Sequence, residues 1–281
     1  MRIGTTSYIY PADIITNVRR LAGRVDDIEI VLFDVDDEEN PLPDRSVLDE
    51  LIALASEFDM TYTVHLPMDL KLADRENTRS IDKAREVIEV MCGIRPWGFV
   101  VHLEGNGRTE GEEASEWVDN ACRSLEALSS AVDDPRLLCA ENLENQEPWM
   151  TTAVVGRTSV SYCVDIGHLW KRGLDPMFYL DMWLPRARVV HLHGYSGKDH
   201  RRLSLMPESA LDPVVERLTD GFRGVVTLEV FSEQNWKDSL ECLAKSSTRV
   251  RGRSRNGTAG DTRTTERLEP VGRNRTPNSR P

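Results

Sequence analysis

Hydrophobic residues along this chain alternate between two kinds of segment. Short apolar runs rich in β-branched residues, typical of strands, lie at residues 2–9, 27–33, 61–67, 98–104, 136–143, 159–167, 187–194 and 224–230. Between them, apolar residues recur at helical spacing over residues 12–23, 46–58, 77–91, 113–132, 175–183, 212–222 and 235–246. The segment EPWMTTAVVG, after the fifth run, is the least clear. Repeated units of a strand and then a helix predict an α/β fold.

The number of these units favours a (β/α)8 TIM barrel, because eight strands alternate with helices at about 30 residues per unit. Many of the runs are apolar without alternation, as expected for parallel strands covered on both faces. A doubly wound open sheet is the alternative. That fold usually carries a glycine-rich phosphate loop after its first strand, but here SYIYPADI follows, with neither nucleotide-binding fingerprint. We expect one barrel domain over residues 1–248.

Charge divides the chain into an acidic body and a basic end. Residues 249–281 hold nine Arg against one Asp and two Glu, which gives +6; since the whole chain carries −12, residues 1–248 carry −18. An acidic body repels a phosphate backbone, so we expect no DNA binding. The basic end has little apolar content and many Arg, Thr, Gly, Asn and Pro, which predicts a disordered tail.

Apolar stretches and cysteine spacing also indicate the cellular compartment. No apolar stretch approaches the ~20 residues of a membrane span, and MRIGTTSY does not resemble a signal peptide. The five cysteines show neither a CxxC motif nor the spacing of a disulfide framework. A cytoplasmic protein without membrane contact is the expectation.

The histidines share one placement. All six lie at, or just beyond, the end of an apolar run: His65, His102, His168, His191, His193 and His200. Three carboxylates share that placement: Glu141, Asp165 and Glu229. The carboxyl ends of barrel strands converge on one rim, and histidine and carboxylate side chains bind divalent metals. The pattern predicts a metal site on that rim; strand-end residues satisfied by local hydrogen bonds are the alternative.

Buried carboxylates strengthen the metal hypothesis. Glu141 and Glu229 each interrupt a run that is otherwise typical of a buried strand, LLCAEN and VVTLEV, and Glu29 in DIEIVLF has the same surroundings. A buried carboxylate needs a partner. That partner is either an Arg or Lys in an ion pair, or a metal ion that several carboxylates reach together.

The sixth run ends in Asp165-Ile-Gly-His168. We expect His168 to follow the strand in a βα turn, where Gly167 permits a tight bend. Both Asp165 and His168 could then point into the barrel mouth and hold a metal ion.

These residues resemble a known superfamily. Glu141, Asp165, His168, His191 and Glu229 are similar in order and strand placement to the metal and substrate set of the xylose isomerase-like barrels, and the resemblance spans residues 2–245. That superfamily includes sugar isomerases and epimerases as well as phosphodiesterases of the endonuclease IV type. The resemblance therefore implies a metal-dependent enzyme.

The two branches of the superfamily differ in their ligands. In sugar epimerases one ion has four ligands, which the resemblance places at Glu141, Asp165, His191 and Glu229. The phosphodiesterase branch adds ligands that correspond here to His65, His102 and the pair Asp199 and His200. In the endonuclease pattern one residue separates that Asp from that His, whereas here they are adjacent, so the role of this pair stays open.

The supply of histidines favours hydrolysis. Several divalent ions a few ångströms apart suit phosphodiester cleavage, because one can lower the pKa of water and another can stabilise the departing oxygen. We expect more than one Zn, Mn or Fe ion, with Glu141 and Glu229 also catalytic. The complete set of predicted metal ligands is His65, His102, Glu141, Asp165, His168, His191, His200 and Glu229.

A narrower resemblance concerns the substrate. GTTSYIYPADI, VDDIEIVLF, YTVHLP and ENLENQ resemble the cobamide-remodelling phosphodiesterases. That family hydrolyses adenosylated cobamides to adenosylcobinamide phosphate and the lower-ligand nucleoside, so the resemblance implies a corrinoid phosphodiester substrate. A sugar isomerase or epimerase with a single divalent ion is the alternative, and a non-catalytic ligand-binding barrel is the second alternative.

Residues on the same rim are candidates for substrate contact. Tyr8 follows the first run and could form an apolar wall. Lys198 and Arg201 follow the seventh run and could neutralise a phosphate, and His193 could contact substrate. Packing against the first helix and a solvated loop are the alternatives for Tyr8 and for the two cations.

Overall fold

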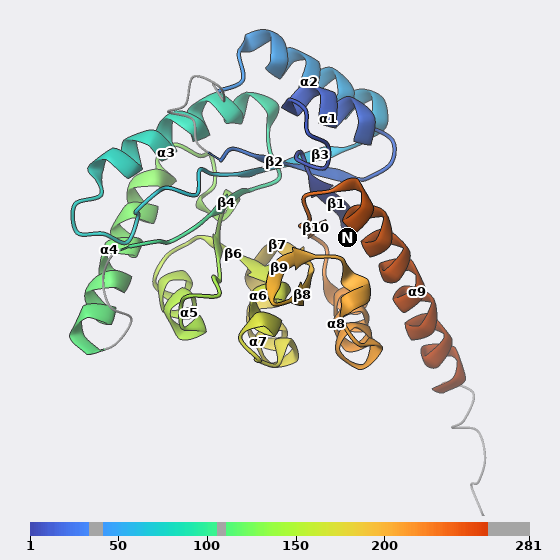
Figure 1. Ribbon diagram of the computed structural model, residues 1–281. Helices are drawn as coiled ribbons and strands as arrows, with labels where there is room; N and C mark the ends of the chain where they lie inside the picture. Colours follow the sequence, from blue (N-terminus) through green and yellow to red (C-terminus); the bar gives the residue numbers. More distant parts are fainter. Residues whose placement is uncertain (34–41, 106–110, 258–281) are drawn as a thin grey trace, which may run out of the picture.

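Eight parallel strands close into a barrel in this computed structural model, which describes residues 1–33, 42–105 and 111–257. Figure 1 shows the strands at the centre and the helices around them. Going round the barrel, the order is β1-β10-β7-β6-β5-β4-β3-β2. The strands are β1 (Arg2–Thr6), β2 (Asp27–Val31), β3 (Thr61–His65), β4 (Phe99–Val101), β5 (Leu138–Glu141), β6 (Ser161–Asp165), β7 (Ala187–Leu192) and β10 (Val225–Leu228). The predicted (β/α)8 barrel is confirmed.

Each strand is shorter than the apolar run that predicted it. The chain leaves the sheet while its side chains are still covered, as at Leu66 and Leu103, which follow β3 and β4 and are fully buried. Hydrophobicity therefore extends past the last paired residue into the rim. This overrun is why the predicted ends lie up to three residues beyond the observed ones.

The helices cover the outside of the barrel. They are α1 (Ile14–Leu21), α2 (Arg45–Phe58), α3 (Thr78–Met91), α4 (Gly111–Ser129), α5 (Pro148–Arg157), α6 (Ile166–Lys171), α7 (Pro176–Trp183), α8 (Glu208–Gly221) and α9 (Glu233–Gly257). The unclear segment after the fifth run is α5, which starts at Pro148 as N-terminal prolines favour. Its buried Met150, Val154 and Val155 stand among neighbours that are themselves largely apolar, so the pattern there has little contrast.

A small hairpin rises from the rim after β7. β8 (Gly194–Ser196) and β9 (Lys198–Arg201) pair antiparallel, and Gly197 between them has a φ of 68°. Gly194 lies so close to the returning strand that a Cβ there would be 2.2 Å from the carbonyl oxygen of Arg202. The hairpin was not predicted, and it carries His200 back over the barrel mouth.

The last helix crosses the predicted domain boundary at residue 248. α9 continues through it to Gly257, so the described residues 249–257 are helical. Arg249 donates from Nε and Nη2 to the buried carboxylate of Asp212 on α8, and Arg253 adds a bond at 3.0 Å. These pairs anchor the basic start of the segment to the body. The rest of the predicted tail, residues 258–281, lies outside the described residues.

None of the helices described here is long and apolar enough to cross a membrane. All five cysteines are free thiols, and Cys139 and Cys163 are buried, as the apolar runs around them predict.

Asp27, at the start of β2, is fully buried below the rim. Its Oδ2 accepts a hydrogen bond from Thr61 Oγ1 at 2.6 Å, whereas Oδ1 has no partner among the described residues. Burial raises the pKa of Asp27 to about 7, against the hydrogen bond from Thr61, which lowers it. The folded protein therefore holds this proton more tightly than the unfolded chain does, and stability falls as pH rises from about 4 to about 7.

Asp27→Asn is expected to remove that pH dependence, because asparagine has the same shape and cannot ionise. We expect the free energy of unfolding of the wild type to fall between pH 4.5 and pH 8 by on the order of 3 kcal/mol more than that of the variant. Urea denaturation at both pH values measures the difference. Parallel pH profiles for the two proteins would contradict this account of Asp27.

Candidate metal centre

A polar layer fills the upper barrel directly above an apolar floor. The floor is a small buried cluster of Val100, Cys139, Cys163 and Val189. Because alternate residues of a strand point to the same side, the residues two positions further on enter the next layer up: His102, Glu141, Asp165 and His191. β2, β3 and β10 contribute Glu29, His65 and, just after the last strand, Glu229. Because side chains alternate along each strand, seven ionisable side chains lie together in one layer of the barrel.

Glu141 lies between two groups of donors. Its Oε2 is 3.1 Å from His102 Nε2 and 3.5 Å from His65 Nε2. Its Oε1 is 3.4 Å from His191 Nδ1 and 3.5 Å from His168 Nδ1. The side chain is 1% exposed. One carboxylate therefore presents an oxygen to each of two separate sets of histidines.

His191 is oriented by a carboxylate that the sequence did not place in the site. Its Nε2 lies 2.8 Å from Glu29 Oε2, and both side chains are fully buried. A proton on Nε2 leaves the Nδ1 lone pair facing Glu229 Oε2 at 3.2 Å and Glu141 Oε1 at 3.4 Å. A lone pair facing carboxylate oxygens is repulsive unless a cation lies between them, and a carboxylate behind a histidine is a common way of orienting a metal ligand.

Asp165 is held by Asn142, which follows the neighbouring strand β5, and by the helix that follows Asp165 itself. Its backbone bonds the side-chain amide of Asn142 in both directions at 2.9 Å. Its Oδ1 accepts the His168 amide at 2.6 Å and so caps α6. Its Oδ2 faces His193 Nε2 at 3.2 Å and His191 Nδ1 at 3.8 Å. One oxygen fixes the local fold, and the other is directed at the site.

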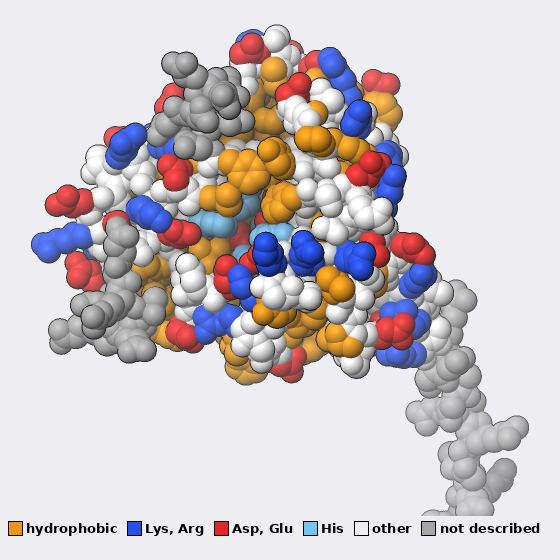
Figure 2. Space-filling model, viewed as in Figure 1, with side chains coloured by type: hydrophobic (Ala, Val, Ile, Leu, Met, Phe, Trp, Pro, Cys, Tyr) orange, Lys and Arg blue, Asp and Glu red, His pale blue; other side chains and the backbone are white. Residues whose placement is uncertain are grey.

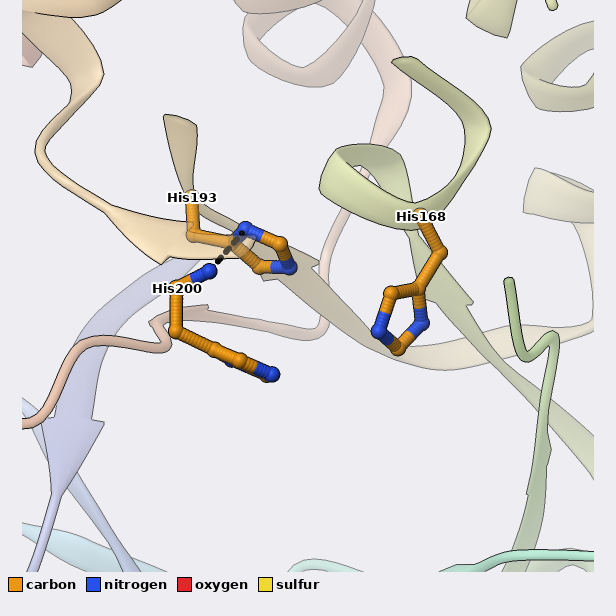
Figure 3. A group of neighbouring side chains, drawn as sticks. All are labelled: His168, His193 and His200. Atoms are coloured by element: carbon orange, nitrogen blue, oxygen red, sulfur yellow. Dashed lines mark hydrogen bonds between the residues drawn. The ribbon is translucent and has the colours of Figure 1, made fainter. Parts of the chain in front are cut away.

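Three histidines gather at the mouth of the barrel, as Figure 3 shows. The rings of His193 and His200 stack with centroids 4.5 Å apart, and the His200 amide donates to His193 Nδ1 at 3.0 Å. His168 lies beside them, with its ring 5.5 Å from that of His193. His200 reaches the site from the hairpin with a φ of 50°, and its Nδ1 is 3.5 Å from Glu229 Oε2.

Gly167 and His193 pack against each other in this corner. Gly167 belongs to α6 and not to a free βα turn; it is needed because a Cβ there would lie 2.1 Å from Cε1 of His193. His193 is fully buried under that helix and directs Nε2 at Asp165. The structure thus places His193 beside the carboxylate of Asp165, and its contact with substrate stays a prediction.

Asp199 is drawn away from its neighbour. Lys171 Nζ lies 2.5 Å from Asp199 Oδ2 and 2.9 Å from Glu144 Oε1. The lysine lowers the pKa of both carboxyls against burial, which raises it. A carboxylate already paired with an ammonium group is a poor metal ligand. Of the adjacent pair, the structure therefore brings His200 into the site and gives Asp199 to Lys171.

The donor set fits divalent metal ions. Four groups of site atoms could each surround an ion, with every ligand atom within 4.8 Å of the others: His65, His102 and Glu141; Glu141, Asp165, His191 and Glu229; Glu141, Cys163 and His191; and His168, His193 and His200. A fifth such group contains the carboxylates that Lys171 occupies. Besides Glu29 Oε1, four buried atoms of these groups lack any hydrogen-bond partner among the described residues: Glu141 Oε1, His191 Nδ1, Glu229 Oε2 and His200 Nδ1. Unpaired buried polar atoms are costly, and bound cations would satisfy all four.

The pKa values of the buried histidines and carboxylates show how the charges of the site are balanced without metal ions. Burial lowers the pKa of His65, but Glu141, Glu29 and Glu229 outweigh it and raise the pKa to about 9. Asp165 and Glu229 likewise raise the pKa of buried His193 to about 9. Burial raises the pKa of Glu141, but His191 and His102 outweigh it and hold the pKa well below its usual range. The layer thus concentrates negative charge that either protons or metal ions must neutralise.

Figure 2 shows a hollow with histidine side chains at its bottom and basic side chains along one edge. Lys198 and Arg201 are exposed on the β8–β9 hairpin and have no ion pair within the described residues. Tyr8 is 47% exposed and meets Phe33 edge-on at 4.9 Å. Because they are exposed, the side chains of Lys198, Arg201 and Tyr8 are accessible to a ligand.

Three solved structures share the fold. A D-tagatose 3-epimerase-like protein is 20% identical with a TM-score of 0.75, and the match covers 90% of this chain and 100% of that one. Endonuclease IV from Thermus thermophilus is 19% identical with a TM-score of 0.68, over 88% and 98% of the two chains. D-psicose 3-epimerase from Clostridium cellulolyticum is 15% identical with a TM-score of 0.61, over 91% and 99%.

Comparison with functionally curated proteins gives no match. The model of one protein family, described as the xylose isomerase-like TIM barrel, matches residues 21–246. This range contains every strand except β1 and all the donors of the polar layer. The chain belongs to the xylose isomerase-like TIM barrel family.

Proposed function

We propose that this protein is a metal-dependent phosphodiesterase that acts on a small molecule, with an adenosylated cobamide as its substrate. The position of Glu141 carries the proposal. Its two oxygens face different sets of histidines, which is the arrangement of a carboxylate that bridges two ions. A single-ion enzyme has no evident use for His65 and His102 on the far side of Glu141.

The chain's own residues would divide the work. His65, His102 and Glu141 would hold one ion, and Glu141, Asp165, His191 and Glu229 a second. Metal ions bound by these residues would polarise a phosphodiester and lower the pKa of water. Lys198 and Arg201, at the edge of the mouth, would orient the anionic diester by charge. The walls of the barrel mouth would limit the access of bulk water.

The charge of the protein and its sequence resemblance limit the class of phosphodiester substrate. Residues 1–248 carry −18, which opposes a long polyanion and favours a small diester. The segments GTTSYIYPADI, YTVHLP and ENLENQ support a cobamide in particular, through their resemblance to the cobamide-remodelling phosphodiesterases. The products would be adenosylcobinamide phosphate and the lower-ligand nucleoside.

A sugar isomerase or epimerase is the second candidate, and one observation favours it. Glu141, Asp165, His191 and Glu229 form a complete four-ligand group without any other histidine. Two of the structures above are named as epimerases or epimerase-like. In such an enzyme the two glutamates would exchange the substrate proton, and His65 and His102 would serve only to balance charge.

Product analysis separates the candidates. The full chain, loaded in turn with Zn2+, Mn2+ or Fe2+, is incubated with adenosylcobalamin, with bis(4-nitrophenyl) phosphate and with a panel of ketoses including D-tagatose and D-psicose. We expect adenosylcobinamide phosphate from the first and 4-nitrophenol from the second. Turnover of a ketose with no cleavage of either diester would overturn the proposal in favour of the epimerase.

A further inference from the structure

A cavity of about 860 Å3 opens beside the metal centre, between the first two βα units. Its walls are the ends of β1 and β2 and the first turns of α1 and α2. That volume lies within the range of pockets that enclose a small organic ligand. The described residues that line it are separate from the ligands of the metal centre.

The lining of the cavity is mainly apolar, and most of its charged residues are acidic. Aromatic and aliphatic side chains dominate it, among them Tyr8, Phe33, Leu42 and Val47. Asp13 and Asp44 cap α1 and α2. Among the described residues of the lining, Arg19 is the only cation, and both ends of its guanidinium fork bind Glu50, at 2.6 and 2.9 Å. This part of the lining therefore offers no free positive charge to an anion.

Aromatic rings connect this cavity with the metal centre. Tyr8 contacts Phe33 at 4.9 Å between centroids, Phe33 lies 6.2 Å from Phe231, and Phe231 lies 5.1 Å from His200. His200 in turn faces Glu229. A planar group in the cavity would thus meet a continuous aromatic surface that ends at the metal ligands.

The two sides of the mouth differ in charge. In Figure 2, hydrophobic side chains gather on the side of the hollow that faces α1 and α2, and a row of basic side chains lies on the opposite side. Lys198, Arg201 and Arg202, all exposed, belong to the hairpin side. A ligand that spans the mouth would place its anionic part toward the hairpin and its uncharged part toward the cavity.

We propose that the cavity holds an uncharged planar aromatic group of the substrate, attached to the phosphodiester that reaches the metal centre. This inference rests on the proposed phosphodiesterase function for the position of the diester. The cavity's preference for an uncharged aromatic group rests only on its own lining. The two can therefore be tested apart.

The first test is direct binding, which requires no catalysis. Metal-free full-length protein is titrated with 2-naphthol at pH 7, and in parallel with 2-naphthol-6-sulfonate, which has the same ring system and one negative charge. We expect saturable binding of the neutral probe and binding about tenfold weaker for the anion. Phe33→Ala should weaken binding of 2-naphthol about tenfold, because one aromatic contact contributes about 1.4 kcal/mol.

Two further variants make this result decisive. Tyr8→Ala removes a half-exposed ring from the same wall and should weaken binding in the same direction with little effect on folding. Phe178→Ala removes an equally large ring that is 62% exposed on α7, away from the cavity, and should leave binding unchanged. Equal affinity in all four proteins, or tighter binding of the sulfonate, would overturn the inference.

The second test links the cavity with the diester. With methyl 2-naphthyl phosphate as substrate, Phe33→Ala is expected to raise KM about tenfold while kcat stays within about twofold, since the Phe33 ring would bind the naphthyl group and take no part in the chemical step. An unchanged KM alongside weakened 2-naphthol binding would show that the cavity does not serve this reaction. Absence of any hydrolysis, with 2-naphthol still bound, would count against the phosphodiesterase and leave the cavity's preference standing.

Discussion

Replacing Glu141 with glutamine is expected to abolish phosphodiester cleavage, with kcat lower by about a thousandfold or more. Glutamine has the same shape but only one carbonyl oxygen, so it can serve one of the two histidine groups that the carboxylate faces. Its NH2 group would be directed at the other group and would repel a cation there. The loss should therefore concern metal content as well as rate.

Elemental analysis of Glu141→Gln, after equilibration with Zn2+ or Mn2+ and gel filtration, should show at least one ion fewer per chain than the wild type. Glu104→Gln is the matched control. Glu104 also follows a strand at the rim, but it is partly exposed and pairs with Lys71, so its metal content and rate should stay near those of the wild type. A Glu141→Gln protein with full metal content and an unchanged rate would contradict the bridging role.

His65→Ala and His102→Ala are expected to have the second largest effect. Each removes a ligand from the group on Oε2 of Glu141 and leaves the group of Glu141, Asp165, His191 and Glu229 intact. We expect each variant to keep one ion, to lose the other, and to cleave diesters at least about a hundredfold more slowly. Metal analysis and initial rates on bis(4-nitrophenyl) phosphate measure both effects.

These histidines also distinguish the two candidate functions. An epimerase that needs only the four-ligand group would keep most of its ketose turnover in His65→Ala and His102→Ala, because that group is undisturbed. Near-normal diester cleavage in both variants would remove these side chains from the active site. Phe178→Ala, on the outer surface of α7, again provides a control for handling and folding.

The positions of the strands in the sequence and the position of the site at the rim of the barrel could be predicted, because both depend on local periodicity. Apolar runs mark parallel strands covered on both faces, and alternation along each strand places Glu141 directly above Cys139, and Asp165 directly above Cys163. Which residues would lie at the rim follows from these two rules. The sequence could not assign the ligands to particular ions, since that depends on which side chains approach one another across the barrel.

Contacts between side chains on opposite sides of the barrel could not be predicted from the sequence. Glu29 orients His191 although 162 residues separate them, and neither segment indicates the other. The same holds for Gly167, whose role depends on the ring of His193 packed against it. Arg-rich composition suggested a tail from residue 249, but the buried carboxylate of Asp212 on another helix turns its first residues into an anchored helix. In each case a distant partner overrides the local pattern.

We propose that this barrel holds at least two metal ions that act together. The most direct measurement is activity as a function of metal equivalents, with the metal-free full-length protein titrated with Zn2+ or Mn2+ at a protein concentration far above the dissociation constants. We predict that diester cleavage rises fully only when two or more ions are bound per chain, with the bound ions counted by elemental analysis of the same samples. Full activity at one bound ion per chain would contradict the account.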